Sequence, residues 1–466
     1  MTSGYESSTT ESPPAASFWT LDRIADALSM MLVSRGPAGN DFLRGVSTDT
    51  RSIAPGDIFV ALAGPTFDAH DFLPRAVESG AAALVVSRAP AIGTVGVPIF
   101  HVQDTLRALG ALARYRRTAW GRPVIGVAGS NGKTTTKDLI RAAVGAVLTV
   151  HATTGNLNNL VGVPLTLLAI SDEADVAVIE IGTNVPGEVA RLRDIALPDI
   201  AVVTSVGEEH LEGLGSMDEV LREETSVYAG ATVAIAPASQ PEIVAAARAL
   251  ARRVVTAGLE AGDLGVSASE VGPDGLGSLT IDGVVVRPPV RGAHNLRNAA
   301  LALAVARECG VAIADAARGM AAMPVPSMRM AWEAIGSATL VNDAYNANPP
   351  SMRAAIDLLS GAGNGRQRVA ILGTMREMGV HADRVHTELA KYALASRADV
   401  IAAVGDMAYA LEREGANDSR VVTAPDVAEL WAILKPRLAL DAVILLKASR
   451  GVRLERLIPM LTEWAR

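Results

Sequence analysis

One short segment, Val124–Lys137 (VIGVAGSNGKTTTK), constrains the fold of this chain more than any other. An apolar run predicts a strand, Gly129 to Gly132 predict a tight turn, and a helical pattern begins near Lys133. Free N–H groups at the start of such a helix, together with its dipole, form a site for an anion. The segment therefore predicts an α/β domain that holds a phosphate group where the strand passes into the helix.

The same segment indicates which nucleotide chemistry to expect. In a phosphate-binding loop a lysine reaches the outer phosphates and the next hydroxyl ligates Mg²⁺, and here these are Lys133 and Thr134. The first glycine of the usual G-x-x-x-x-G-K-[ST] pattern falls on Val127, so this loop reads G-x-x-G-K-T. The alternative is a glycine-rich turn with a solvated lysine. The strand before it and the helix after it favour ATP with Mg²⁺, bound by Gly129, Ser130, Asn131, Gly132, Lys133, Thr134 and Thr135.

Composition narrows the class of protein. The chain has 466 residues, enough for about three domains, and is 49% hydrophobic. Its net charge of −8 argues against nucleic-acid binding and against an anionic membrane surface. The single cysteine, Cys309, excludes a disulfide framework and fits a reducing compartment. Residues 1–17 are rich in Ser, Thr, Glu and Pro, which predicts a disordered tail. We expect a cytoplasmic protein without integral membrane contact.

Hydrophobic patterning predicts an α/β fold in three parts. A small α/β domain is expected over residues 18–107, with short strands within Asp57–Ala63 and Ala82–Val86. A central P-loop ATPase-type α/β domain is expected over residues 108–324, where near-continuous apolar runs indicate buried parallel strands and Val266–Val290 indicates hairpins. Strand and helix patterns alternate over residues 325–466, which predicts a doubly wound sheet.

Polar residues at the predicted carboxyl ends of strands are candidates for the site, since ligands gather at that edge of a parallel sheet. Glu180 ends one strand and could hold the metal that bridges ATP phosphates, although it could also simply begin a loop. His210 follows the next strand, where it is either a metal ligand or an exposed spectator. Asn295 could read a base edge or cap a helix. An amide cluster suits either turns or recognition of sugar and peptide groups: Asn156, Asn158 and Asn159.

Taken together, the motifs resemble the Mur ligase family, and within it the branch that adds D-alanyl-D-alanine to UDP-N-acetylmuramoyl-tripeptide. The resemblance covers nearly the whole chain after residue 17, and the YNANP and GNLNN strings are more specific to this branch than the phosphate loop. The motifs that carry it are Ser47–Leu62, Phe67–Phe72, Gly129–Lys137, Gly155–Leu168, His210–Ser216, Ala293–Ala299, Asn342–Met352 and Lys447–Gly451.

The resemblance implies a domain for the UDP end of the substrate, an ATPase core and a Rossmann-like lid. It implies ATP-dependent ligation through an acyl phosphate, with Lys133, Glu180 and His210 as catalytic residues and Mg²⁺ near Thr134, Glu180 and His210. Asn295 would contact adenine, while Arg329 and Asp343 would reach ATP from the lid. The residues expected to bind substrate are Thr48, Asp49, Arg51, Asp68, His70, Asn156, Asn158, Asn159, Tyr345, Asn346 and Asn348, of which Thr48, Asp49 and Arg51 would hold the UDP portion.

This chain departs from the family pattern at three places. The family has a lysine that is carbamylated to bind metal, and Glu224 stands there, with Glu223 beside it. The paired aspartates before YNANP are Asn342 and Asp343, and the family's GDM string has Thr374 in the middle. We expect Glu224 either to supply the metal-binding carboxylate directly or to be a solvated helix residue.

Three functions remain compatible with these motifs. The first is the cell-wall ligase, expected to be a monomer whose partners are UDP-N-acetylmuramoyl-tripeptide, D-Ala-D-Ala and ATP. The second is a paralogue that joins another amine to another carboxylate, and the third is a weakly catalytic homologue that binds a nucleotide sugar. The intact Lys133, Thr134, Glu180 and His210 argue against the third. Either meso-diaminopimelate or lysine fits as the third residue of the substrate peptide.

Overall fold

The computed structural model describes residues 18–30, 42–88, 96–325, 327–362 and 365–466. Contacts divide the chain into two compact units, one made of Met1–Gly121 with Leu160–Ile170 and the other of Arg122–Asn159 with Ser171–Arg466. The expected tail, residues 1–17, lies outside the described residues. Both units carry parallel sheets with helices, so the α/β class is confirmed. The three-domain boundaries near residues 107 and 324 stay a proposal.

A four-stranded parallel sheet is the centre of the first unit. Its strands, in spatial order, are β3 (Val46–Ser47), β4 (Ile58–Val60), β5 (Ala83–Val86) and β6 (Ile99–His101). Alternate residues of these strands enter two separate cores, as expected for a sheet covered on both faces. One core includes α1 (Leu21–Ala27), α3 (Thr105–Trp120) and α5 (Gly162–Leu168), and the other includes α2 (Leu73–Glu78). A short antiparallel pair, β1 (Trp19–Thr20) and β2 (Phe42–Leu43), also lies in this unit.

Six parallel strands form the sheet that carries the phosphate loop. In spatial order they are β12 (Arg253–Ala257), β11 (Val233–Pro237), β10 (Ile200–Val203), β7 (Val124–Ala128), β9 (Val176–Glu180) and β8 (Val150–Ala152). The near-continuous apolar runs are buried over their whole length, as predicted for parallel strands. The surrounding helices are α4 (Lys133–Val144), α6 (Glu188–Ala196), α7 (Leu211–Leu214), α8 (Met217–Thr225), α9 (Pro241–Leu250) and α11 (Ile313–Ala321).

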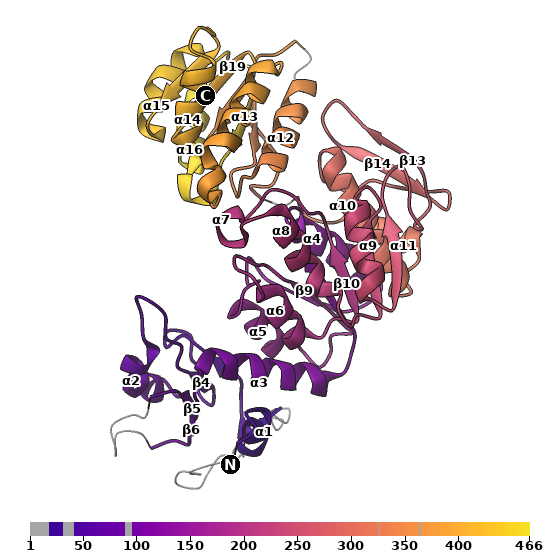
Figure 1. The fold of residues 1–466 in the computed structure, drawn as a ribbon, viewed down its shortest axis with the longest axis vertical. Coiled ribbons are helices and arrows are strands. Elements are labelled where there is room, and N and C mark those ends of the chain that lie inside the picture. The colour runs from indigo at the N-terminus through magenta and orange to yellow at the C-terminus, as the bar shows by residue number, and fades with distance from the viewer. Residues whose placement is uncertain (1–17, 31–41, 89–95, 326, 363–364) are drawn as a thin grey trace, which may run out of the picture. The chain divides into compact units, whose positions relative to one another are not determined.

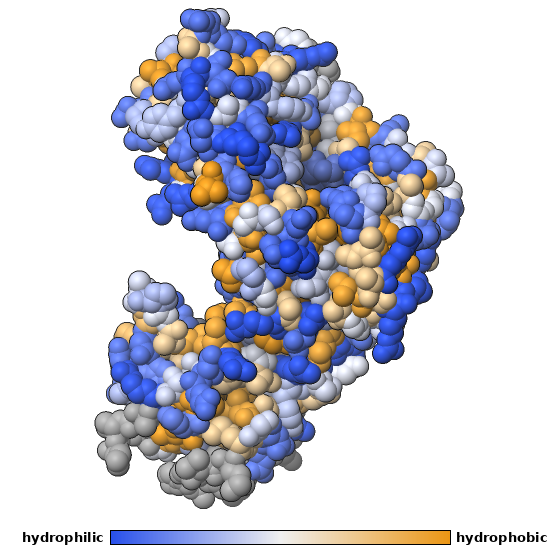
Figure 2. Space-filling view, viewed as in Figure 1, coloured by the Kyte–Doolittle hydropathy of each residue, from blue (hydrophilic) through white to orange (hydrophobic). Residues whose placement is uncertain are grey.

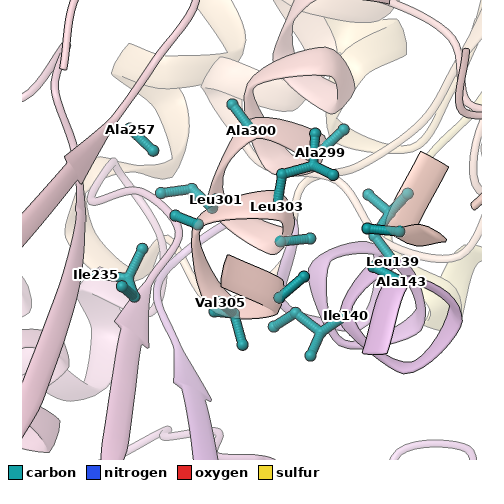
Figure 3. Packing of buried hydrophobic residues seen from close by; sticks show 14 of the residues in the cluster. Leu139, Ile140, Ala143, Ile235, Ala257, Ala299, Ala300, Leu301, Leu303 and Val305 are labelled. Carbon is teal, nitrogen blue, oxygen red and sulfur yellow. The ribbon is translucent and has the colours of Figure 1, made fainter. Parts of the chain in front are cut away.

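Helix α10 (Ala293–Glu308) is apolar on nearly all sides because it is buried among neighbours on all sides. Figure 3 shows its Ala299, Leu301, Leu303 and Val305 packed near α4 and the strand residue Ile235. The region expected to form hairpins is an antiparallel sheet that packs on the same core: β13 (Val266–Val271), β14 (Gly277–Ile281) and β15 (Val284–Val286). This packing fixes the amino end of α10 beside the phosphate loop, where Asn298 meets Gly132.

The second six-stranded sheet is doubly wound, as predicted. Its order is β16 (Ala331–Ile335), β17 (Ala338–Asn342), β21 (Val443–Lys447), β18 (Arg368–Leu372), β19 (Val400–Val404) and β20 (Val421–Ala424), with only β16 antiparallel to its neighbour. Helices α12 (Pro349–Gly361), α13 (Ala382–Ala395) and α14 (Asp406–Glu414) cover one face, while α15 (Val427–Leu434) and α16 (Leu457–Trp464) cover the other (Figure 1). Alternate residues of β19 enter the two cores, which explains its unbroken apolar sequence.

Hydrophilic residues dominate the face shown in Figure 2, with smaller hydrophobic groups between them. Scattered exposed apolar side chains such as Val380, Tyr409 and Leu440 are ordinary for a folded protein. Among the helices of the described ranges, none has both the length and the apolar character that a bilayer crossing requires.

Candidate functional site

Two glycines fix the conformation of the phosphate loop between β7 and α4. Gly129 has a φ of +121° and Gly132 a φ of +85°, which side chains with a Cβ rarely adopt. A Cβ on Gly129 would lie 2.3 Å from Oγ1 of Thr204, and one on Gly132 would lie 2.5 Å from Nδ2 of Asn298. The loop is therefore held by close packing against Thr204, which follows β10, and against α10, as well as by its own sequence.

Lys133 begins α4 and folds back over the loop. Its Nζ donates to the carbonyl oxygens of Gly129, at 2.5 Å, and Ser130, at 3.4 Å. Burial alone would lower the pKa of this ammonium group, but the nearby charges of Glu209, Glu224 and Glu180 outweigh it and raise the pKa. Lys133 therefore stays charged at neutral pH, as a group that neutralises phosphate must.

Two buried carboxylates line the cavity in front of the loop. Glu180, at the end of β9, is 2% exposed, and its Oε1 accepts from Nδ2 of Asn158 at 2.9 Å. Within the described part of the chain, its Oε2 and the Oε2 of Glu209 are buried without a hydrogen-bond partner. A buried carboxylate oxygen without a partner is costly unless a cation or donor approaches it. Both residues thus fit a site completed by a ligand.

His210 is held between two carboxylates. Its Nδ1 lies 2.5 Å from Oε2 of Glu377, and its Nε2 lies 3.3 Å from Oε1 of Glu209. Burial would lower its pKa, but these two contacts raise it to about 9. The backbone at His210 has a φ of +53°, an uncommon conformation for a residue other than glycine. His210 lines the cavity, as predicted, and binding a metal would require its ring to lose a proton.

The two adjacent glutamates of α8 have different environments. Glu223 accepts hydrogen bonds from the backbone N–H groups of Gly187 and Val189, both at 2.7 Å, and so holds the amino end of α6. Glu224 is 1% exposed, and its Oε2 accepts from the N–H of Gly129 at 2.6 Å. Burial raises the pKa of Glu224, while the charge of Lys133 lowers it. The structure therefore identifies Glu224 as the residue that contacts the phosphate loop, and its role as a metal ligand stays a prediction.

Groups from residues after 325 complete the same cavity. Nη2 of Arg329 donates to Oγ1 of Thr134 at 2.9 Å, and its guanidinium lies 4.1 Å from the ring centre of Tyr345. Asp343 forms a 2.6 Å ion pair with Lys447, a buried cation at the end of β21. The predicted residues that line the cavity are Ser130, Asn131, Gly132, Lys133, Thr134, Thr135, Asn158, Asn159, Glu180, His210, Asn295, Arg329, Asp343, Tyr345 and Asn346.

The structure also shows the hydrogen bonds of three predicted asparagines, Asn348, Asn156 and Asn295. Asn348 caps α12 and also donates through Nδ2 to Oδ1 of Asn131 at 2.7 Å, which ties the YNANP string to the phosphate loop. Asn156 is exposed and its carbonyl accepts from the N–H of Asn158. Asn295 is not the N-cap of α10, since Gly292 is, and its Nδ2 donates to the carbonyl of Arg291. Its contact with adenine stays a prediction.

The residues predicted for the UDP portion lie in the first unit. Arg51 forms a bidentate pair with Asp49 (2.6 Å at the shortest), which lowers the pKa of Asp49 to about 2. His70 is buried, its Nδ1 lying 2.6 Å from Asp68 and its Nε2 accepting from the N–H of Ser87 at 2.9 Å. His70 therefore links its loop to the end of β5. Contacts of Asp68 and His70, and of the half-buried Thr48, with substrate stay predictions.

Sequence reasoning missed several residues of the cavity, Glu209 and His294 among them, and left two departures from the family pattern unexplained. Glu209 lines it next to His210, and the Glu-Glu-His run is the signal that could have identified it. His294 also lines it, and burial lowers its pKa to about 4. The hydroxyl of Thr374 accepts from the N–H of Asp406, the first residue of α14, at 2.9 Å. Oδ1 of the buried Asn342 accepts from the N–H of Ala344 at 3.4 Å.

Among the described residues, no three His, Cys, Asp or Glu side chains stand together as a ready-made metal site. The donors present still fit Mg²⁺, which prefers one or two carboxylates together with a hydroxyl, phosphate and water. Glu180 with its unpaired oxygen, and Thr134 beside it in the cavity, are donors of that kind.

Comparison with known proteins agrees with this geometry. Three family models match in order: "Mur ligase family, catalytic domain" over residues 43–117, "Mur ligase middle domain" over residues 127–306, and "Mur ligase, glutamate ligase domain" over residues 328–450. The UDP-N-acetylmuramoyl-tripeptide–D-alanyl-D-alanine ligase of Bacillus subtilis is 35% identical over 432 residues, which is 90% of this chain and 93% of that protein.

Solved structures give the same result. A crystal structure of MurF from Acinetobacter baumannii has a TM-score of 0.86 and 30% identity, covering 96% of this chain and 99% of that chain. MurF ligase from Thermotoga maritima in complex with ADP has a TM-score of 0.80 and 26% identity, covering 91% of this chain and 98% of that chain. Since three family models span most of the chain and a relative this similar aligns along 90% of it, the chain belongs to the Mur ligase family.

Proposed function

We propose that this chain is the ATP-dependent ligase that joins D-alanyl-D-alanine to UDP-N-acetylmuramoyl-tripeptide in cytoplasmic peptidoglycan synthesis. The observation that supports it most is a single cavity that combines the phosphate loop, two buried carboxylates and the YNANP region. The relatives that match along nine-tenths of the chain carry the same activity in their names. The enzyme acts as a monomer.

The first chemical step transfers the γ-phosphoryl group of ATP to the terminal carboxylate of the tripeptide. The carboxylate oxygen forms the new bond to phosphorus, ADP leaves, and an acyl phosphate results. Two anions must approach each other for this, so stabilisation of negative charge is the main requirement. Lys133 and Arg329, both lining the cavity, supply fixed positive charge at the loop.

When bound, Mg²⁺ would supply positive charge that neutralises part of the charge of the ATP phosphates. Thr134, Glu180 and His210 are the residues that would hold it, with Glu224 close behind the loop at Gly129. Asn158 donates to Oε1 of Glu180, and within the described residues Oε2 has no partner, so Oε2 would be the oxygen available to the metal.

In the second step the free amine of D-Ala-D-Ala attacks the acyl carbon. The C–N bond forms, the C–O bond to phosphate breaks, and the proton lost by the amine ends on the departing phosphate. Water must be excluded because it would hydrolyse the acyl phosphate. The contacts of Arg329 with Thr134 and of Asn348 with Asn131 hold the YNANP region against the phosphate loop for this purpose.

An acceptor panel tests the proposal. Phosphate release is measured with ATP, UDP-N-acetylmuramoyl-tripeptide and D-Ala-D-Ala, and each component is omitted in turn. A second series supplies the UDP-linked dipeptide with meso-diaminopimelate or lysine. Turnover should require all three components of the first series. Turnover in the second series but not in the first would contradict the proposed substrate and indicate another ligase of this family.

A further inference from the structure

Helix α4 carries a second lysine, Lys137, one turn after Lys133, and this one is only 4% exposed. Its Nζ donates to the carbonyl oxygen of Thr153 at 2.9 Å and lies 3.1 Å from Oδ1 of Asp138. An ammonium group is rarely buried unless it is paired, because its removal from water is costly. Lys137 is therefore held inside the protein by these two acceptors, and its contact with Thr153 joins α4 to the end of β8.

Thr153 directly follows β8 and contacts the neighbouring strand β9. Its backbone N–H donates to the carbonyl of Val178 at 3.0 Å, and its Oγ1 accepts from the backbone N–H of Glu180 at 2.9 Å. Glu180 is buried, and a buried N–H group without an acceptor costs stability. The hydroxyl of Thr153 therefore supplies the acceptor that Glu180 needs at the end of β9.

The loop that begins at Thr153 also reaches the side chain of Glu180. Nδ2 of Asn158 donates to Oε1 of Glu180 at 2.9 Å, and the carbonyl of Asn158 accepts from the N–H of Gly182 at 2.8 Å. A Cβ on Gly182 would lie 2.9 Å from Cγ of Asn158, so glycine at this position leaves the space that the amide fills. Residues 153–158 thus hold Glu180 at two points, its N–H group and its Oε1.

These contacts form a continuous path from Lys137 to the carboxylate of Glu180. Lys137 fixes the carbonyl of Thr153, and the hydroxyl of the same residue fixes the backbone of Glu180. Oε2 of Glu180 has no partner within the described residues and faces the ligand cavity. Mg²⁺ requires near-ideal octahedral geometry, so a carboxylate that binds it must be held accurately.

We propose that Lys137 is a positioning residue for the metal-binding carboxylate, because it holds Thr153 where the threonine hydroxyl fixes Glu180. The inference rests on the proposed function, in which ATP binds with Mg²⁺. The two lysines of α4 then have separate tasks. Lys133 supplies positive charge at the phosphates, whereas Lys137 acts on Glu180 through Thr153 and does not touch the nucleotide.

The test measures how the affinity for ADP depends on Mg²⁺. Calorimetric titration of ADP is repeated at increasing free Mg²⁺ with the wild-type enzyme, Lys137→Met and Thr153→Val. The affinity of the wild-type enzyme should rise with Mg²⁺. Both variants should need about 10- to 100-fold more Mg²⁺ for half of this rise, the range for loss of a residue that orients a metal ligand. In ligation assays KM for Mg²⁺ should increase similarly, while kcat at saturating Mg²⁺ changes much less.

A Glu180→Gln background shows whether the effect passes through Glu180. Once the charge of this carboxylate is removed, adding Lys137→Met should not change the Mg²⁺ dependence further, since the two positions act through one contact path. A further large shift in the double variant would contradict the proposed path.

Thr136→Val is the matched control. Thr136 precedes Lys137 on α4, is 0% exposed, and its Oγ1 has no hydrogen-bond partner within the described residues. The substitution exchanges a buried hydroxyl for a methyl group, as Thr153→Val does, but without loss of a hydrogen bond. Its Mg²⁺ dependence should equal that of the wild-type enzyme.

A merely structural role predicts a different result. A lower Tm of Lys137→Met together with wild-type Mg²⁺ dependence in both variants would overturn the inference. If Lys137→Met does not fold, Thr153→Val decides alone, because it keeps the carbonyl that Lys137 contacts and removes the acceptor of the Glu180 N–H. Absence of wild-type turnover with D-Ala-D-Ala would overturn the proposed function, whereas ADP binding needs no acceptor and still decides the role of Lys137.

Discussion

The adjacent glutamates of α8 offer the sharpest single test of the site, because the same substitution should have opposite consequences at the two positions. Glu223→Gln and Glu224→Gln each keep the shape of the side chain and remove one negative charge. Glu223 holds the amino end of α6, whereas Glu224 contacts the N–H of Gly129 in the phosphate loop. We expect the first variant to lose stability and the second to lose function.

The magnitudes follow from the contacts. Glu223 receives N–H donors on both oxygens, so a glutamine must direct its NH₂ group toward one of them. Losing one hydrogen bond to a charged group costs about 2 kcal/mol, or roughly 4–8 °C in Tm at 2–4 °C per kcal/mol. Glu224 receives one N–H, which a glutamine oxygen can still accept, so its loss of stability should be under about 1 kcal/mol.

Function should show the reverse order. A carboxylate that contributes to Mg²⁺ binding carries charge that an amide lacks, so Glu224→Gln should reduce the rate at limiting Mg²⁺ by about 10- to 100-fold, equivalent to 1.4–2.7 kcal/mol. Calorimetric titration of Mg²⁺ into the enzyme with ADP gives a second readout. Since no carbamate has to form, added bicarbonate should not change the activity of the wild-type enzyme. Equal, small effects of the two variants on Mg²⁺ dependence would refute the assignment of Glu224.

Three further predictions address the loop and its neighbours. Lys133→Ala should lower the rate of ligation by about 10³-fold or more, since it removes a charge acting on the transferred phosphoryl group. Calorimetry should show unchanged affinity for the UDP-linked substrate, because the residues predicted to bind its UDP portion lie in the first unit. Gly132→Ala should weaken ADP binding at least tenfold, because the new Cβ would lie 2.5 Å from Asn298 and the backbone φ is +85°. Retention of wild-type affinity for ADP would show that the loop adjusts freely. The pKa of His210 in the folded state is about 9, so the protonated ring stabilises the fold fully below about pH 6.5, and this stabilisation is lost as pH rises through 9. Tm of the enzyme without added Mg²⁺ should therefore fall between these pH values. A His210→Gln variant should show a flatter curve of Tm against pH.

The sequence by itself determined the local elements and their chemical class. The apolar run before Gly129 and the helical pattern after Lys133 specify a strand, turn and helix whose geometry is local, and the structure confirms β7, the loop and α4. The turns within Val266–Val290 likewise predict the hairpins of β13 to β15. Strand and helix alternation after residue 325 predicts a doubly wound sheet, because parallel strands need crossover connections.

Strand order and the division into units depend on long-range packing. Nothing in the sequence indicates that β21, the last strand along the chain, lies between β17 and β18. The division also separates Leu160–Ile170 from its chain neighbours, because α5 packs on α3 in the core of the first unit. Such contacts arise from shape and burial across large sequence separations, which local propensity does not encode.

The same reason explains which parts of the site only the tertiary structure decided. Glu223 and Glu224 are chemically identical in the sequence, and their roles differ because one faces α6 and the other faces a loop that lies 95 positions away in the chain. Lys137 is linked to Glu180 by Thr153, which lies 16 positions from the one and 27 from the other along the chain. Sequence motifs therefore identify the chemistry that a residue can perform, whereas packing between distant segments determines which residue performs it.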